Sequence, residues 1–230
     1  MTDTGTGSKT AKSEVTKKKI IDSYLELIPR KKWDKITVKE LCVQAGITRG
    51  TFYQYFNDIY DMMEQIEEPM LDDLNHRYQS LPAKQAAIYP PEQFNQRFEY
   101  GPPKELFVWF NFCKKYHNAV AVLLDPRNGD TYFVKKLKTI LTEHINRIMD
   151  CDGMPKDSLR EHFTKIFLEL HFLSARSWLD STNDTFLATD EIINLLNTMR
   201  VGANYLSYKQ LTAPDFNDKM NFTLEEAEET

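Results

Sequence analysis

The sequence predicts an all-α protein in which a small N-terminal helical domain precedes a larger helical domain. Two observations support this fold class. Apolar residues recur every three or four positions through most of the chain, which is the spacing of amphipathic helices. Residues 36–61 contain two short helical segments, each preceded by a capping residue and separated by a glycine. We expect four regions: a disordered arm at 1–9, a helix-turn-helix domain at 10–60, a helical regulatory domain at 61–210 and an acidic tail at 211–230.

The first helix is expected over residues 10–28. Pro29 should end it, because the residue before a proline is disfavoured in the α conformation. The helix carries an apolar stripe made of Val15, Ile20, Ile21, Tyr24, Leu25 and Ile28.

The second helix has a clear start and a clear end. Thr37 and Glu40 form a T-x-x-E capping box, in which each side chain accepts from a free backbone N–H of the other residue. Gly46 stands where a helix end normally needs a positive φ. Thr48 can then cap a third helix, which we expect to run to about Phe56. Two helices joined by so short a glycine-containing turn form a helix-turn-helix.

The third helix is expected to have one buried and one polar face. Phe52 and Phe56 are four residues apart and point inward. Gly50 costs a helix about 1 kcal/mol relative to alanine. It indicates either a close approach of DNA to the backbone or relief of crowding against the second helix, and we favour the approach of DNA. The polar face consists of Arg49, Gly50, Thr51, Tyr53, Gln54 and Tyr55.

The charge distribution agrees with a nucleic-acid-binding N-terminal region. The whole chain has a net charge of −5. Residues 9–60, however, hold 11 Lys and Arg against 6 Asp and Glu, whereas residues 61–230 hold 18 against 27. A basic segment on an acidic body is expected when one small region faces phosphates.

The remaining helices are expected in the second domain. Pro69 should kink or break the first of them. Residues 81–103 carry five prolines and should form a loop. The expected helices cover about 60–79, 104–117, 117–124, 130–149, 157–180 and, after a Thr189 cap, 189–210.

The run Ile-Thr-Arg-Gly-Thr-Phe-Tyr-Gln-Tyr-Phe at 47–56, preceded by Thr-Val-Lys-Glu-Leu and a basic first helix, resembles the DNA-binding domain of TetR-family transcriptional regulators. The resemblance covers about residues 12–62. It implies a homodimeric repressor that binds a palindromic double-stranded DNA operator and is released by a small-molecule effector. Gln54 is expected to read a base, since glutamine can bond both N7 and N6 of adenine. The implied DNA-binding residues are Thr37, Thr48, Arg49, Gly50, Thr51, Tyr53, Gln54 and Tyr55.

Position 59 departs from the family pattern. The family usually has a lysine there that holds a phosphate, and this chain has Ile59. We expect one phosphate contact fewer, with the lysines of residues 9–19 and 30–39 compensating through looser contacts.

The last two long helices are expected to form the dimer interface. Their apolar residues could equally form an intramolecular core. The need for two helix-turn-helix units to read a palindrome favours a dimer. The residues concerned are Leu159, Phe163, Ile166, Phe167, Leu170, Leu173 and Trp178, with small Ser174, Ala175 and Ser177, and then Ile192, Leu195, Leu196, Met199, Gly202, Ala203 and Leu206.

In the family, an effector cavity lies among the helices of the second domain. An aromatic lining would suit an apolar or planar molecule. The same residues are as readily explained as core. The candidate pocket residues are Tyr78, Trp109, Phe112, Tyr116 and Phe167.

Other function classes find little support in the sequence. Enzyme signatures such as G-x-S-x-G, H-E-x-x-H and glycine-rich phosphate loops are absent. The three isolated cysteines share no metal or disulfide pattern, so we expect no metal and no cofactor. No apolar segment reads as a membrane span or secretion signal, which indicates a cytoplasmic protein without a membrane partner. The alternative function is a co-activator or nucleoid-associated factor of the same fold that acts through protein contacts.

Overall fold

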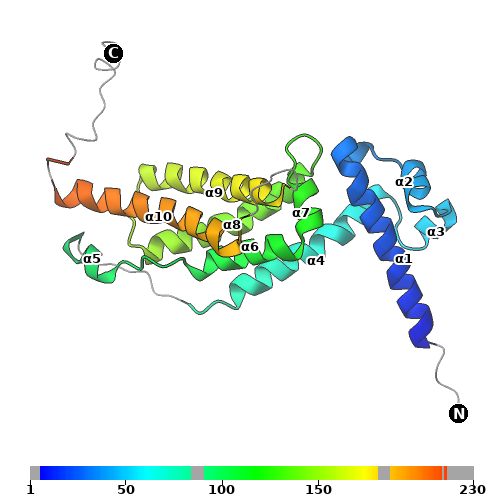
Figure 1. Ribbon diagram of the computed structural model, residues 1–230, viewed down its shortest axis with the longest axis horizontal. Coiled ribbons are helices and arrows are strands. Elements are labelled where there is room, and N and C mark those ends of the chain that lie inside the picture. Colours follow the sequence, from blue (N-terminus) through cyan, green and yellow to red (C-terminus); the bar gives the residue numbers. More distant parts are fainter. Residues whose placement is uncertain (1–5, 84–90, 181–186, 214, 217–230) are drawn as a thin grey trace, which may run out of the picture.

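The computed structural model describes residues 6–83, 91–180, 187–213 and 215–216, and throughout these ranges the secondary structure is helical, without a strand. A small domain at one end joins an elongated helical body (Figure 1). Within the described ranges, no helix combines the length and the apolar character that a membrane span requires.

The small domain consists of α1 (Thr6–Leu27), the 3-10 helices η1 (Ile28–Arg30) and η2 (Trp33–Lys35), α2 (Val38–Ala45) and α3 (Arg49–Tyr53). Residues 6–9 of the expected arm are thus helical, while residues 1–5 lie outside the described part. The α1–α2–α3 core is fully buried at Tyr24, Leu41 and Phe52.

The predicted capping signals are confirmed. Glu40 N donates to Thr37 Oγ1 at 3.2 Å, and Thr37 N donates to Glu40 Oε2 at 2.8 Å. Gly46 ends α2 with a φ of 60°. Thr51 N donates to Thr48 Oγ1 at 3.1 Å, which caps α3.

The third helix is shorter than predicted. It ends at Tyr53 instead of Phe56, because Gln54 N donates to Thr51 O at 3.3 Å and so tightens the last turn. The chain must also leave the helix in time for Asp58 to cap α4, where the Asp58 side chain accepts from Asp61 N at 2.8 Å.

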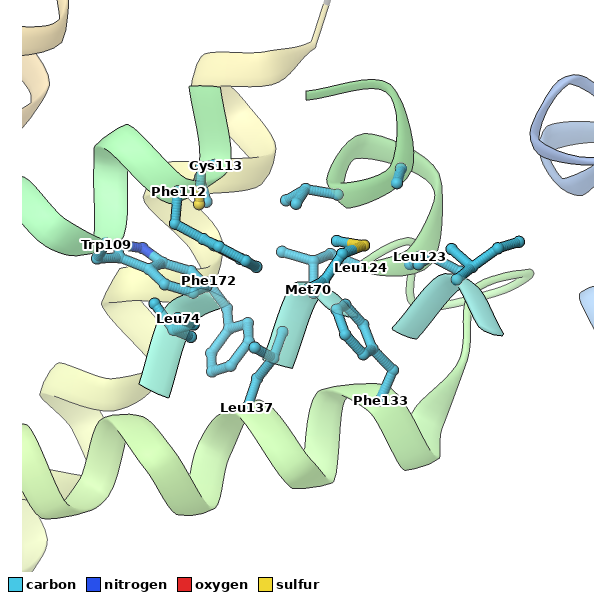
Figure 2. Packing of buried hydrophobic residues seen from close by; sticks show 14 of the residues in the cluster. Met70, Leu74, Trp109, Phe112, Cys113, Leu123, Leu124, Phe133, Leu137 and Phe172 are labelled. Atoms are coloured by element: carbon cyan, nitrogen blue, oxygen red, sulfur yellow. The ribbon is translucent and has the colours of Figure 1, made fainter. Parts of the chain in front are cut away.

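In the described part of the chain, the body is built from six longer helices. Their bounds are α4 (Ile59–Gln79), α6 (Lys104–Lys115), α7 (His117–Leu123), α8 (Thr131–Cys151), α9 (Ser158–Leu179) and α10 (Thr189–Thr212). Figure 2 shows aromatic and aliphatic side chains from α4, α6, α8 and α9 meeting in a common core, among them Leu74, Trp109, Leu137 and Phe172.

Two details of the helices differ from the predictions. The helix α4 continues through Pro69 without a break. The proline ring is exposed, and Met63, Met70 and Leu74 on either side bury the opposite face, so packing outweighs the lost backbone bond. Thr189 is not the cap of α10, because Ala188 precedes the helix and its N–H donates to Glu191 Oε2 at 2.6 Å.

Part of the expected proline-rich loop is helical. Residues 84–90 lie outside the described part, but η3 (Pro91–Gln93) and α5 (Phe94–Arg97) follow them. Phe94 stacks on Tyr208 of α10 with ring centroids 4.7 Å apart. Arg200 of α10 donates to the carbonyl of Glu99 at 2.6 Å. These contacts from α10 hold the segment in place.

The predicted acidic tail begins inside α10, since that helix continues to Thr212. Residues 217–230 lie outside the described part of the chain.

Candidate nucleic-acid interface

The polar face of α3 is presented to solvent by a buried aromatic anchor. Phe52 is 0% exposed and Phe56 is 2% exposed, whereas Tyr53, next to Phe52, is 56% exposed. The predicted DNA-binding residues fall on this outward side. Thr48, Arg49, Gly50, Tyr53 and Gln54 are exposed, and Thr51 and Tyr55 are half-buried.

The space around Gly50, at the start of α3, is open enough for a side chain. A Cβ atom added there would meet Thr48 Oγ1 at 3.7 Å, which is an ordinary van der Waals contact. Crowding against α2 therefore does not explain this glycine. The Thr48 and Thr51 hydroxyls lie 2.9 Å apart and form an adjoining polar edge.

Thr37, at the start of α2, is exposed but already engaged. Its hydroxyl donates to Glu40 Oε2 at 2.7 Å. Lys31 Nζ donates to the same carboxylate at 2.8 and 2.9 Å. Hydrogen bonds from Lys31, and then from Thr37, lower the pKa of Glu40 to about 2. The Lys31 ammonium thus partly neutralises the charge of the Glu40 carboxylate, which would otherwise repel a phosphate near Thr37.

The two tyrosines of the segment differ in exposure. The Tyr53 ring meets the Phe52 ring edge to face at 5.4 Å, so its orientation is supported by the core. Tyr55 is half-buried beside Phe56, and its carbonyl accepts from Gln65 Nε2 at 3.4 Å. Tyr53 is therefore the more accessible of the two.

Ile59 has a packing role. It is 7% exposed, opens α4 and belongs to the apolar core together with Met62 and Met63. The residue that replaces the family's phosphate-binding lysine therefore faces inward.

Several lysines expected to compensate for that loss are partly neutralised. Lys18 pairs with Asp22 at 2.5 Å, and Lys32 and Lys35 each lie 3.8 Å from Asp34. Sequence reasoning missed these pairs, although the i, i+4 spacing of Lys18 and Asp22 is a visible signal. The exposed lysines of the small domain also include Lys12, Lys19 and Lys39.

Residues 20–66 match the family model of bacterial regulatory proteins, tetR family. The helix-turn-helix region is therefore that of TetR-family transcriptional regulators, a class of regulatory proteins and not of enzymes. A search of curated protein sequences gives no match.

Solved structures of TetR-family regulators share the fold. A putative regulator from Syntrophomonas wolfei is 14% identical with a TM-score of 0.55, and the match covers 84% of this chain and 96% of that one. The regulator from Streptococcus agalactiae 2603V is 16% identical with a TM-score of 0.52, over 84% and 97%. The regulator from Streptomyces coelicolor is 17% identical with a TM-score of 0.51, over 89% and 86%.

The five candidate pocket residues lie in the core of the body. Tyr78, Trp109, Phe112 and Phe167 are at most 1% exposed, and Tyr116 is half-buried. Phe112 links two of them, with ring centroids 5.8 Å from Trp109 and 5.2 Å from Tyr116. Trp109 Nε1 donates to His171 O at 3.3 Å.

Two buried histidines adjoin these aromatic residues. His144 stacks on Tyr78 at 3.8 Å, and His171 meets Phe167 at 4.8 Å. Burial lowers the pKa of both, that of His171 to about 4. Both imidazoles are therefore neutral at pH 7. The described residues contain no group of His, Cys, Asp or Glu side chains arranged to hold a metal ion.

Proposed function

We propose that this regulator is a homodimeric repressor that binds a palindromic operator through α3 and is released by a small molecule bound in its helical body. The observation that carries the proposal is the exposed polar face of α3, held outward by the buried Phe52 and Phe56. A short helix supported in this way fits the major groove, which admits an α-helix.

Each predicted contact follows from side-chain chemistry. Among the predicted DNA-binding residues, Arg49 and Gln54 are the exposed side chains able to make two hydrogen bonds to one base, so we assign base reading to them. Thr48, Thr51, Tyr53 and Tyr55 carry hydroxyls suited to phosphate oxygens. Gly50 leaves room for the DNA backbone, and Thr37 contacts a phosphate at the start of α2.

Homodimerisation is supported by an apolar face on α9 and α10. Phe167, Ala175, Trp178, Ile192 and Leu196 are buried within the protomer and are not available to a partner. A second set remains outside this core. Ile166 and Leu173 on α9 are 62% and 54% exposed, and Leu195, Met199 and Leu206 on α10 are 47%, 41% and 38% exposed.

The spacing of these residues suits helix pairing. On α10, Leu195, Met199, Gly202 and Leu206 follow at intervals of four, three and four residues and so share one face. An added Cβ at Gly202 would meet nothing within 4 Å, so a partner helix can approach closely there. We assign the interface to this face.

The effector is proposed to be apolar or planar and to bind among the aromatic residues of α4, α6 and α9. Trp109, Phe112 and Phe167 are tightly packed. Binding would therefore separate side chains that are in contact here. Because genomic DNA is the target, we assign the protein to the cytoplasm.

Selection from random double-stranded DNA tests the proposal. We expect enrichment of a palindrome whose half-sites lie about one helical turn apart. Footprinting on genomic DNA should then find few sites, one of them beside a regulated promoter. Failure to enrich any sequence would contradict operator binding. Enrichment of many dispersed sites without symmetry would favour the nucleoid-associated alternative.

A further inference from the structure

The turn between α7 and α8 contacts the DNA-binding domain directly. This turn, residues 124–130, lies beside the end of α1 (Figure 1). Asn128 O accepts from the backbone N–H of Trp33 at 3.1 Å. Asn128 Nδ2 donates to Pro29 O at 3.0 Å. One residue of the body is thereby bonded to both η1 and η2, the segment that connects α1 to α2.

The turn is rigid on the body side. Asp125 Oδ1 accepts from the N–H groups of Arg127 and Asn128 at 2.9 and 2.8 Å. A Cβ at Gly129 would lie 2.3 Å from Leu123 O and 2.6 Å from Asp125 O, so only glycine fits without movement. Asp130 then caps α8, with its carboxylate accepting from Tyr132 N at 2.6 Å.

The segment that Asn128 contacts, η1 and η2, is fixed within the small domain by the contacts of Trp33. Trp33 is 8% exposed, and its carbonyl accepts from the Tyr24 hydroxyl of α1 at 3.2 Å. Its ring meets Tyr60 of α4 edge to face at 5.4 Å. Trp33 therefore joins α1, η2 and α4, and both bonds from Asn128 end on a fixed part of the small domain.

We propose that Asn128 is a positioning residue that sets the orientation of the DNA-binding domain relative to the body. The continuous chain connects the two parts through α4, and α7 also lies against α1 and η1. The hydrogen bonds of Asn128 add a connection to particular atoms of the α1–α2 segment, and such directional bonds restrict the angle between the two parts more closely than surface packing does. This role rests on the proposed function, because in a dimer that angle determines the separation of the two α3 helices.

The same turn is also connected to the body core. Leu123, just before the turn, and Leu124, its first residue, enter that core, and Phe133 and Leu137 enter it just after the turn (Figure 2). A repacking of the core on ligand binding would therefore move Asn128 through α7 and α8. The two neutral hydrogen bonds of Asn128 can break and reform in response.

An intrachain distance measurement tests the orientation without DNA. Spin labels are placed at the exposed Lys39 and Lys135 by substitution with cysteine, in a Cys151→Ser background, because Cys42 and Cys113 are buried. Labelled protein is diluted with unlabelled protein, so that distances between protomers do not contribute. Asn128→Ala removes the bond to Pro29, and Asn128→Asp replaces its donor with a carboxylate. Arg127→Ala is the matched control, since Arg127 supports the turn through its backbone N–H.

We expect one narrow distance distribution for the unsubstituted chain and for Arg127→Ala, and a shifted or broader one for both Asn128 variants. Identical distributions in all four proteins would overturn the proposal. This result does not depend on DNA binding, so it separates failure of the positioning role from failure of the proposed function.

The preference for one operator spacing is a second measurement. It would not change if Asn128 only stabilised the fold. The selected operator is compared with versions whose half-sites are one base pair closer or farther apart. We expect Asn128→Ala to reduce the preference for the selected spacing at least about threefold, because specificity is a ratio of affinities and a loosened domain accepts other spacings. An equal loss of affinity at all three spacings would contradict the positioning role.

Discussion

Gly50 separates the requirements of folding from those of DNA binding at a single residue. Its added Cβ would make only one ordinary contact, with Thr48 Oγ1 at 3.7 Å. Replacing a glycine inside a helix with alanine stabilises by about 0.5–1 kcal/mol. We therefore expect Gly50→Ala to raise the free energy of unfolding by this amount in urea denaturation. A loss of stability instead would mean that crowding against α2 is the reason for the glycine.

The buried side chain of Glu67, on α4, should make the free energy of unfolding depend on pH. It is 3% exposed. Burial, and then the neighbouring Asp130 carboxylate, raise the pKa of Glu67 from 4.5 to about 7, against a lowering contribution from Lys136, whose Nζ lies 3.2 Å away. The unfolded chain loses this proton near its ordinary pKa while the folded chain retains it. The contribution of Glu67 to the free energy of unfolding therefore falls as pH rises from about 4.5 to 7.

We expect Glu67→Gln to remove this fall. Relative to the unsubstituted protein, the variant should gain about 1–2 kcal/mol between about pH 5 and pH 8. This is less than the full 1.36 kcal/mol per pKa unit, because Lys136, which pairs with the buried Glu67 carboxylate, is itself half-exposed and screened by solvent. Denaturant unfolding at both pH values measures it. The comparison must be between variant and parent, since the lowered pKa of His171 makes stability fall in the opposite direction, as pH drops below 6.5. Parallel pH profiles would rule out a raised pKa for Glu67.

At the scale of elements, the turn between α7 and α8 depends on Gly129. A methyl group there would overlap Leu123 O and Asp125 O, at 2.3 and 2.6 Å. We expect Gly129→Ala to destabilise the protein by about 2 kcal/mol or more, as overpacking against a fixed backbone does. Gly101→Ala is the control, because a Cβ there meets nothing within 4 Å. Equal melting temperatures for the two variants would contradict this account of the turn.

Elements fixed by local signals could be predicted from the sequence. The Thr37–Glu40 capping box, the positive φ of Gly46 and the Thr48 cap all follow from neighbours a few residues away. Elements fixed by distant contacts could not. The helix α5 depends on Phe94 packing against Tyr208, more than a hundred positions later in the chain.

The same limit applies to the sites. The exposed face of α3 was visible in the spacing of Phe52 and Phe56, which alone defines the buried side. The turn containing Asn128 was also visible as Asp-Pro-Arg-Asn-Gly, but its partners Pro29 and Trp33 were not. Helical periodicity places a residue on the apolar side of a helix, but it does not show whether that side packs in the core of the protomer or is exposed. For that reason the sequence could not separate Phe167, which is buried, from Ile166, which is exposed.

At the scale of the whole molecule, the proposed dimer rests on the outer face of α9 and α10. We expect Met199→Glu to convert the dimer to a monomer in sedimentation velocity, because it places a charge in the centre of an apolar contact. Tyr132→Glu is the matched control, since Tyr132 is 71% exposed and lies at the start of α8, outside α9 and α10. If Met199→Glu sediments as the parent protein does, the interface lies elsewhere.

The measurement that tests the central claim most directly is the affinity of Gly50→Glu for the selected operator, together with its melting temperature. A glutamate at Gly50 would point its charge at the DNA from the exposed start of α3. Gly101→Glu adds the same charge to the body, where a Cβ also meets nothing within 4 Å. We predict that Gly50→Glu binds at least about a hundredfold more weakly, through phosphate repulsion, while the control binds normally and both proteins melt near the parent temperature. Undiminished binding by a folded Gly50→Glu protein would contradict the assignment of α3 as the DNA-reading helix.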